Sequence, residues 1–358
     1  MNDALRAVRL VFLGAAALTV TSALAADYPA PQEADWIVTD FRFHTGEMLP
    51  ELRLHYMTIG DPDGIPVLIL HGSSRAGTSF LNDRFAGELF GPGQPLDAAK
   101  YYLILPDAIG AGKSSKPSNG LRAKFPQYSY DDIVLGHYRL LTEHLGINHV
   151  RLVLGSSAGG METWVWGVSY PDFMDALVPL AALPMPMSGR NWMMRRMVID
   201  AILNDPEWND GNYTTQPQAW KRAYAYFVMA TNGGTRAIYK AASTREETDR
   251  NIAARLAAGT EMDASDILYA YSASRDYDPT PQLERIEAAL LSVNAEDDER
   301  NPVELGVLER EVTRVKNGRF IVIPASENTR GHGTTQDASL WKNELEALLW
   351  SAPMRHPD

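Results

Sequence analysis

The sequence predicts an α/β fold, in which a mostly parallel central sheet is flanked by helices and a helical segment is inserted between two strands. Four nearly continuous apolar runs are typical of parallel strands covered on both faces: IPVLILHG (65–72), YYLILPD (101–107), VRLVLGSS (150–157) and ALVPLAAL (176–183). Helical patterns lie between these runs, and such alternation indicates a parallel sheet. Residues 185–285 then interrupt the alternation with mainly helical patterns rich in Met, Trp, Tyr, Arg and Ala.

Two runs near the start of the chain predict an antiparallel pair of strands. WIVTDFRF (36–43) and ELRLHYMTI (51–59) are β-rich, and Gly46 and Pro50 lie in the loop between them. A helix is expected at DDIVLGHYRLLTEHLG (131–146), where apolar side chains recur at the spacing of one helix face. It precedes the third of the four apolar runs, as a crossover between parallel strands requires.

Strands resume after the helical segment and define the expected division of the chain. ALLSVNAEDD (289–298) and RFIVIPAS (319–326) read as strands, and a terminal helix is expected at 337–350. With 358 residues, of which 45% are hydrophobic, the chain is long enough for one large core with an insertion. We therefore expect a core formed by 26–184 and 286–358, and a helical lid at 185–285.

The first residues resemble a secretory signal peptide. Arg6 and Arg9 precede an uncharged stretch from Leu10 to Ala26, and 23–25 read Ala-Leu-Ala, the small residues that a signal peptidase favours. An uncleaved membrane anchor is the alternative. We expect residues 1–25 to be removed, the mature protein to be periplasmic or secreted, and no later segment to insert stably in a membrane.

The composition excludes several classes of function. The formal net charge is −12, from 45 Asp and Glu against 33 Lys and Arg, so a phosphate backbone would be repelled and no nucleic acid is expected as a partner. The chain has no cysteine, which excludes disulfides, thiolate metal sites and a cysteine nucleophile. It has no HExxH pattern, and the GKS at 112–114 lacks the first glycine of a phosphate-binding loop, because that position is Asp107. We expect neither a metal nor a cofactor.

A glycine-rich motif follows the third apolar run. In GSSAG (155–159), Ser157 stands between a predicted strand and a helix that begins near Gly160. A nucleophile elbow needs this context, because small flanking residues tolerate the sharp turn that lifts the serine hydroxyl out of the sheet. Ser156 points elsewhere in such a turn and is assigned a structural role. The alternative is an ordinary turn serine, since the motif is short.

Two later strand ends supply the partners that a reactive serine needs. NAEDDERNP (294–302) offers acidic side chains at 296–299, and TRGHGT (329–334) places His332 in a glycine-flanked loop. The carboxyl ends of parallel strands share one edge of a sheet, so these groups are expected near Ser157. Serine, acid, histidine is the chain order of the α/β-hydrolase triad. A loop histidine and a solvated acidic loop are the structural alternatives, but agreement at three strand ends favours catalysis.

A serine nucleophile also needs donors for the oxyanion that forms on the attacked carbonyl. The backbone N–H of Ala158, directly after the serine, is one candidate. The loop HGSS (71–74) after the first apolar run offers a second, for which we select the N–H of Ser73. A plain turn that ends the strand is the alternative for this loop.

Several segments together resemble the homoserine O-acetyltransferase group of the α/β-hydrolase superfamily. They are LVLGSSAGGMETWVWGVSYPD (152–172), NDPEWNDGNY (204–213), MDASDILYAYSASRDYD (262–278) and the closing GHG (331–333), and the likeness covers roughly residues 50–350. The resemblance implies an α/β-hydrolase fold with a helical lid that often mediates dimerisation, so a homodimer through the lid is expected.

The resemblance also implies roles for single residues. Ser157 would be the nucleophile, His332 the base and Asp298 the acid. Asp298 is preferred to Asp297 because the acid of this family usually stands four residues before a proline, here Pro302.

The substrate implied by the resemblance is less certain than the fold, because activity varies within a fold. The family uses an asparagine and an arginine of the lid near the carboxylate of its acceptor, and Asn191 and Arg195 are their counterparts; a structural contact within the lid is the alternative. The family's histidine is commonly followed by an acidic residue that holds the amino group of homoserine, whereas Gly333 follows His332. This difference disfavours an amino-acid acceptor.

The sequence therefore predicts an exported serine hydrolase that cleaves small carboxylic esters through an acyl-enzyme on Ser157. The alternative is an acyl-CoA-dependent O-acetyltransferase of the homoserine O-acetyltransferase type. Acetyl-CoA does not cross membranes unaided, so export favours water as the acceptor. Amide hydrolysis and a non-catalytic binding protein on the same fold are the remaining alternatives.

Overall fold

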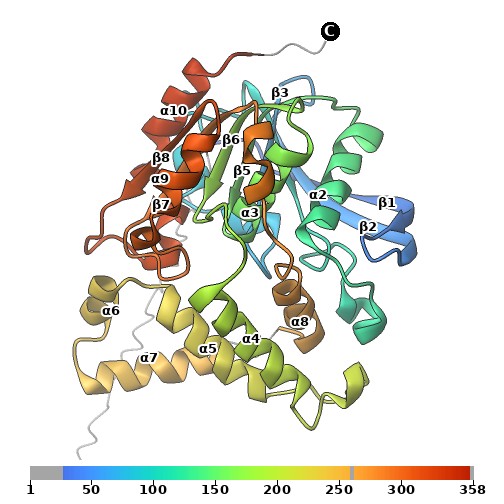
Figure 1. Ribbon diagram of the computed structural model, residues 1–358, viewed down its shortest axis with the longest axis vertical. Coiled ribbons are helices and arrows are strands. Elements are labelled where there is room, and N and C mark those ends of the chain that lie inside the picture. The colour runs from blue at the N-terminus through green and yellow to red at the C-terminus, as the bar shows by residue number, and fades with distance from the viewer. Residues whose placement is uncertain (1–26, 259–261, 355–358) are drawn as a thin grey trace, which may run out of the picture.

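The computed structural model describes residues 27–258 and 262–354. The predicted signal peptide, residues 1–25, lies outside the described residues. No helix of the described segments is long and apolar enough to cross a bilayer. Figure 1 shows a twisted sheet with helices on both faces and a group of helices at one end.

The described residues form one eight-stranded sheet in the order β1-β2-β4-β3-β5-β6-β7-β8. An antiparallel hairpin opens it, and β2 also pairs antiparallel with β4; all other neighbours are parallel. The predicted mostly parallel α/β fold is confirmed. The strands are β1 (Gln32–Arg42), β2 (Met48–Ile59), β3 (Ile65–Leu70), β4 (Tyr101–Pro106), β5 (Val150–Ser156), β6 (Met174–Leu180), β7 (Ala289–Ala295) and β8 (Gly318–Ile323).

Alternate residues of each central strand enter two different hydrophobic cores. In β3, Leu68 and Leu70 face one core, and Val67 and Ile69 face the other, and all four are fully buried. The first core is covered by α2 (Tyr130–Arg139), α3 (Ala158–Ser169) and α9 (Val307–Glu311), and the second by α1 (Ala86–Leu89) and α10 (Lys342–Ser351). Burial on both faces explains why these strands are continuous apolar runs.

Two predicted helices differ from the observed ones at one end. The helix expected at 131–146 is α2, which starts at its capping residue Ser129 and changes into a π-helical turn, Leu140–His144. The terminal helix expected at 337–350 is α10, which begins later because Ala338–Leu340 forms a separate 3-10 turn. The spacing of hydrophobic residues does not distinguish a 3-10 or π-helical turn from an α-helix.

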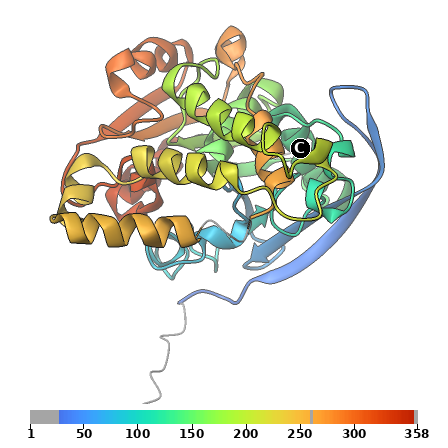
Figure 2. The ribbon, with the colours of Figure 1, turned by 90° about the horizontal axis from the view of Figure 1, so that it is seen from below.

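Five helices are inserted between β6 and β7, within the predicted lid segment. They are α4 (Gly189–Leu203), α5 (Ala219–Thr231), α6 (Thr235–Ala241), α7 (Arg245–Ala258) and α8 (Ala264–Ser272). Figure 2, seen from the side of the lid, shows α4, α5 and α7 lying across the end of the core. Side chains of α4 and α5, among them Val198, Ile202 and Phe227, join the first core. The lid is therefore anchored to the core by apolar packing.

Candidate active site

Ser157 occupies the sharp turn between β5 and α3. Its backbone has φ 60° and ψ −112°, in a region that residues other than glycine rarely adopt. The N–H of Ser157 donates to the carbonyl of Leu180 on β6 at 2.8 Å, which fixes the turn to the neighbouring strand. This is the strand-turn-helix context that the GSSAG motif predicts.

The glycines of the motif are required because backbone segments approach closely. A Cβ atom at Gly155 would lie 2.1 Å from the carbonyl oxygen of Gly159, and one at Gly159 would lie 2.1 Å from that of Leu70 on β3. At Gly160, a Cβ would lie 2.6 Å from the carbonyl oxygen of Leu180. Any side chain at these three positions would push the start of α3 away from the sheet, and Ser157 with it.

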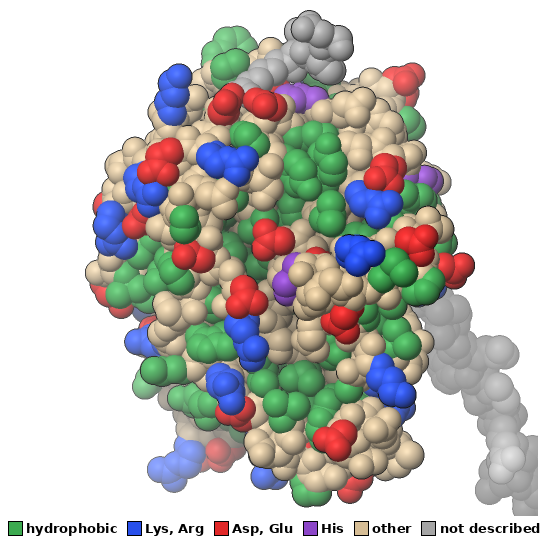
Figure 3. Space-filling view, turned by 45° about the vertical axis from the view of Figure 1, so that its right-hand side comes forward, with side chains coloured by type: hydrophobic (Ala, Val, Ile, Leu, Met, Phe, Trp, Pro, Cys, Tyr) green, Lys and Arg blue, Asp and Glu red, His purple; other side chains and the backbone are tan. Residues whose placement is uncertain are grey.

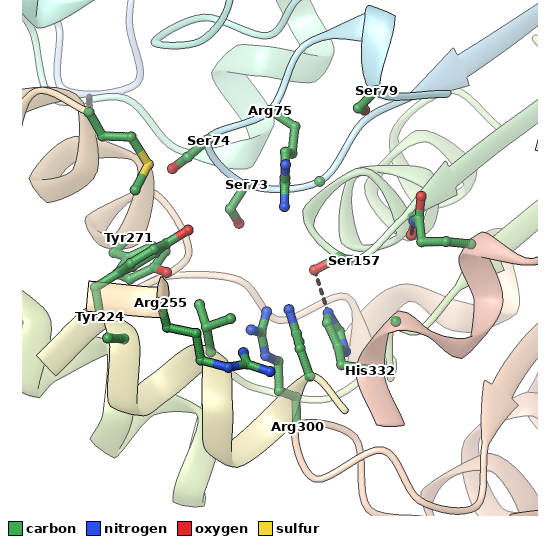
Figure 4. A pocket seen from close by; sticks show the side chains of 18 of the residues that line it. Ser73, Ser74, Arg75, Ser79, Ser157, Tyr224, Arg255, Tyr271, Arg300 and His332 are labelled. Carbon is green, nitrogen blue, oxygen red and sulfur yellow. Dashed lines mark hydrogen bonds between the residues drawn. The ribbon is translucent and has the colours of Figure 1, made fainter. Parts of the chain in front are cut away.

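The structure brings together the three side chains that the sequence singles out. The Ser157 Oγ lies 2.8 Å from His332 Nε2, and His332 Nδ1 lies 2.9 Å from Asp298 Oδ2 (Figure 4). An ionised carboxylate only accepts hydrogen bonds, so Nδ1 carries the proton and Nε2 is left to accept the proton of the serine hydroxyl. Asp298 follows β7, and His332 lies on the 3-10 turn Gly331–Gln336 after β8.

Asp298, rather than the neighbouring Asp297, contacts the histidine. The Oδ1 of Asp298 accepts from the N–H of Arg300 at 2.9 Å, and its Oδ2 accepts from the amide of Asn301 at 2.9 Å. Burial raises the pKa of Asp298, but the His332 charge, its hydrogen bond and those from Asn301 and Arg300 outweigh burial, so the net shift is downward. Asp297 instead accepts a hydrogen bond from Thr329 at 2.8 Å.

Asn301 is a positioning residue that the sequence alone does not reveal. Its amide donates both to Asp298 and, at 2.8 Å, to the carbonyl of Ala181 after β6. It thereby ties the acidic loop to the neighbouring strand end. Its place directly before Pro302 carries no recognised motif, so only its proximity to Asp298 could have suggested it.

The surroundings of His332 favour the neutral imidazole. Burial is the largest cause of its lowered pKa, and the positive charges of Arg300 and Arg195 act in the same direction. Asp298 opposes this shift without reversing it. The histidine is therefore available as a proton acceptor at neutral pH.

Both candidate oxyanion donors lie beside Ser157. Ala158 is the first residue of α3, so its N–H has no partner within the helix. Ser73 lines the same cavity as Ser157. The loop that carries it is held by His71, whose Nε2 accepts from the N–H of Ala108 at 3.0 Å and whose Nδ1 donates to the carbonyl of Gly72 at 2.8 Å. Burial lowers the pKa of His71, in keeping with this neutral form.

Ser157 and His332 open into a cavity of about 670 Å³ between the core and the lid. The lid contributes Tyr224, Val228 and Tyr271, and the core contributes the loop after β3. Three arginines line it as well: Arg75, Arg255 and Arg300. No motif indicates this set, because its members come from segments that are far apart in the chain.

Arg195 and Asn191 lie near the cavity without lining it. Arg195 is fully buried, donates to Asn191 Oδ1 at 3.0 Å and to Ser274 Oγ at 3.4 Å, and stacks over the ring of Tyr271. Tyr271 lines the cavity, whereas the two predicted substrate contacts stand behind it. Their role in binding substrate remains a prediction. In the described part of the chain, no group of three or more His, Asp or Glu side chains is arranged to hold a metal ion.

Comparison with known proteins decides the family. A sequence family described as alpha/beta hydrolase fold matches residues 65–326. The chain belongs to the α/β-hydrolase fold family. Within it, a "Probable acyltransferase" from Methanothermobacter thermautotrophicus is 29% identical to this α/β-hydrolase over 279 residues, which are 76% of this chain and 84% of that protein.

Two further known proteins are similar to this α/β-hydrolase. A homoserine O-acetyltransferase from Haloferax prahovense is 32% identical over 203 residues, so this chain spans about half of that relative, 48% of its length. The structure of an acetylester hydrolase from Corynebacterium glutamicum matches with a TM-score of 0.77 at 20% identity, over 89% of this chain and 96% of that one. The predicted resemblance to the homoserine O-acetyltransferase group is confirmed.

Proposed function

We propose that this chain is an exported serine hydrolase that cleaves small carboxylic esters. The observation that carries the proposal is the hydrogen-bonded chain from Ser157 through His332 to Asp298 at the wall of a cavity. Export rests on the charge and hydropathy pattern of residues 1–25.

The geometry supports a two-step mechanism. His332 Nε2 takes the proton of Ser157 as the hydroxyl oxygen attacks the ester carbonyl, while Asp298 stabilises the imidazolium that forms. The N–H groups of Ala158 and Ser73 hold the oxyanion. The imidazolium then protonates the departing alcohol, which leaves the acyl group bound to Ser157. A water molecule that gives its proton to His332 releases the acid and restores the serine.

O-Acetyl transfer is the second candidate, and the names of the relatives favour it. The acyl-enzyme would be the same, with an alcohol in place of water as the acceptor. Two features support hydrolysis instead. Gly333 stands where the acetyltransferases commonly carry an acidic residue after the histidine, and an exported enzyme would lack acetyl-CoA.

Substitution of Ser157 tests its role as the nucleophile. Ser157→Ala removes the attacking oxygen, so we expect the hydrolysis rate of p-nitrophenyl acetate to fall by about 10⁴-fold or more and labelling by a fluorophosphonate to be lost. Ser156→Ala is the matched control, because Ser156 is adjacent but bonds to Gln336 and not to His332. It should still be labelled. Labelling of Ser157→Ala at the wild-type rate would remove Ser157 from the mechanism.

The same assay separates the two candidate functions. Release of acetate from an ester without added acceptor supports the hydrolase. Consumption of acetyl-CoA only when homoserine is present, with no ester hydrolysis, would replace it by the transferase.

A further inference from the structure

Among the described residues, no carboxylate forms an ion pair with the arginines that line the catalytic cavity, although Asp298 lies near Arg300. Among the described residues that line the cavity, Arg75, Arg255 and Arg300 are the charged side chains, and none is acidic. A neighbouring cavity of about 640 Å³ lies between α6 and α7, shares Arg75 and Arg255, and has no acidic residue among its described lining residues. It adds Arg330, which pairs with Asp337 at 4.0 Å. The lack of acidic lining residues is unexpected in a chain with a net charge of −12.

Several arginines elsewhere in the molecule pair with carboxylates. Arg139 pairs with Glu143, Arg151 with Asp175 and Arg314 with both Glu284 and Glu311. On the face shown in Figure 3, blue and red side chains are interspersed. The lack of acidic side chains in the cavity lining therefore differs from the mixed charges on this face.

Arg300 and Arg255 are held in place by neutral groups, whereas Arg75 is exposed. Arg300 Nε donates to Thr231 Oγ1 at 2.8 Å, and its guanidinium stacks over the ring of Phe227 at 4.1 Å. Arg255 Nε donates to Asn251 Oδ1 at 2.6 Å. Each interaction fixes one side of the guanidinium and leaves its terminal nitrogens without a hydrogen bond to any described residue. Figure 4 shows Arg75 reaching in from the loop after β3, with Arg255 and Arg300 on the opposite side.

Such an arrangement is unfavourable unless a ligand compensates it. Burial lowers the pKa of Arg300 to about 10; Tyr271 and Asp298 oppose this shift, the nearby Arg195 acts with it, and the group stays charged at neutral pH. Charges of one sign that are withdrawn from water repel each other and lose solvation. Guanidinium groups pair bidentately with carboxylates and phosphates, which would remove both costs.

Neutral polar atoms in the same wall also lack partners. The hydroxyl of Ser74 and the side-chain oxygen of Asn232 are buried without a hydrogen bond to any described residue, and both residues line the cavity. Buried polar groups are normally satisfied, so a polar ligand is expected to supply the missing contacts.

We propose that the substrate of this site is an ester that carries an anionic group, a carboxylate or a phosphate, bound by Arg300, Arg255 and Arg75 while the ester carbonyl faces Ser157. This inference rests on the proposed function and names its substrate class. It assigns the anion to arginines that line the cavity, not to Arg195 behind Tyr271. The acyl-enzyme chemistry is unchanged, because the anionic group takes no part in bond making.

Three acetyl esters that differ only in the group at the far end of the ring test the proposal. They are 4-acetoxybenzamide, which is neutral, 4-acetoxybenzoate, which carries a carboxylate, and 4-acetoxyphenyl phosphate. We expect kcat/KM of the wild-type enzyme to be about 10- to 100-fold higher for at least one anionic ester than for the amide. The better of the two anions identifies the group that the site takes.

The variants Arg300→Gln and Arg255→Gln show whether the arginines cause this preference. The readout is the ratio of kcat/KM for the anionic and the neutral ester, which a general loss of activity does not change. We expect the ratio to fall by about tenfold in each variant. Arg222→Gln, which removes the same charge from an exposed position on α5 that lines neither cavity, should keep the wild-type ratio.

The outcomes separate this inference from the proposed function. Equal kcat/KM for the three esters, or a ratio that neither Arg300→Gln nor Arg255→Gln alters, overturns the anion site and leaves the hydrolase in place. No hydrolysis of any ester, together with no labelling of Ser157 by a fluorophosphonate, overturns the hydrolase itself.

Discussion

In the proposed mechanism His332 must be neutral to accept the proton of Ser157, and its environment favours that form. Burial is the main cause of its lowered pKa, and Arg300 contributes in the same direction, against the opposing charge of Asp298. The arginine proposed to hold the substrate anion thus also bears on the catalytic base. Binding an anion beside Arg300 would partly offset that contribution.

This coupling predicts how the rate depends on pH. Activity is lost as His332 becomes protonated, so the acid limb of kcat/KM for the neutral ester should lie below 6.5, the ordinary histidine pKa. Arg300→Gln removes a positive charge near His332. The pKa of His332 should then rise, so the acid limb of kcat/KM should move to higher pH. A limb above 6.5 in the wild-type enzyme would contradict the assignment of the base.

The reactive side chains were predictable from the sequence, and their supporting residues were not. Ser157 lies in a recognised motif, and His332 follows in the chain order of a known triad. Asn301 and Arg300 act through their proximity to Asp298 and belong to no motif. Their roles follow from distances between side chains in the folded protein. The spacing of residues along the chain does not predict these distances.

The turn between β5 and α3 predicts a large difference between two glycines. Gly159→Ala would place a Cβ atom 2.1 Å from the carbonyl oxygen of Leu70, so the free energy of unfolding should fall by about 1–3 kcal/mol or more. Gly87→Ala on α1 is the control, since its nearest contact is an ordinary 3.7 Å and the expected change is within about 1 kcal/mol. Urea unfolding followed by circular dichroism measures both. Equal stability of the two variants would show that the turn relaxes.

Strand positions were predicted well where both faces of the sheet are covered. The run at 101–107 corresponds to β4 (Tyr101–Pro106), and the run at 150–157 corresponds to β5 (Val150–Ser156). A strand buried on both sides has no polar face, so its apolar sequence is easily recognised. The runs at 65–72 and 289–298 extended beyond the strands β3 and β7, since their last residues belong to the loops that carry His71 and Asp298.

The lateral order of the strands was not predictable from the same runs. β2 pairs with β4 and not with β3, its successor in the chain, and β3 lies between β4 and β5. Hydrophobic patterns identify the strands but do not say which are neighbours. The meeting of Arg75, Arg255 and Arg300 at one cavity depends on this order and on the placement of the lid, so it could only be seen in the folded chain.

Export is a prediction about the protein in its cell. If residues 1–25 are a signal peptide, the mature chain should occur in the periplasmic or secreted fraction and begin near residue 26. Cell fractionation with mass spectrometry of the amino terminus tests this. A full-length chain confined to the cytoplasm would contradict export and would make acetyl-CoA available as an acyl donor. A chain that keeps residues 1–25 and sediments with membranes would favour the anchor.

The backbone at Ser157 has a consequence for the history of the protein. A positive φ at serine costs on the order of 1–3 kcal/mol, whereas glycine adopts it freely. The proposed reactivity of Ser157 therefore comes with a loss of stability at this position. A descendant that no longer needed the reaction would be free to drift to glycine there, and its fold would gain from the loss.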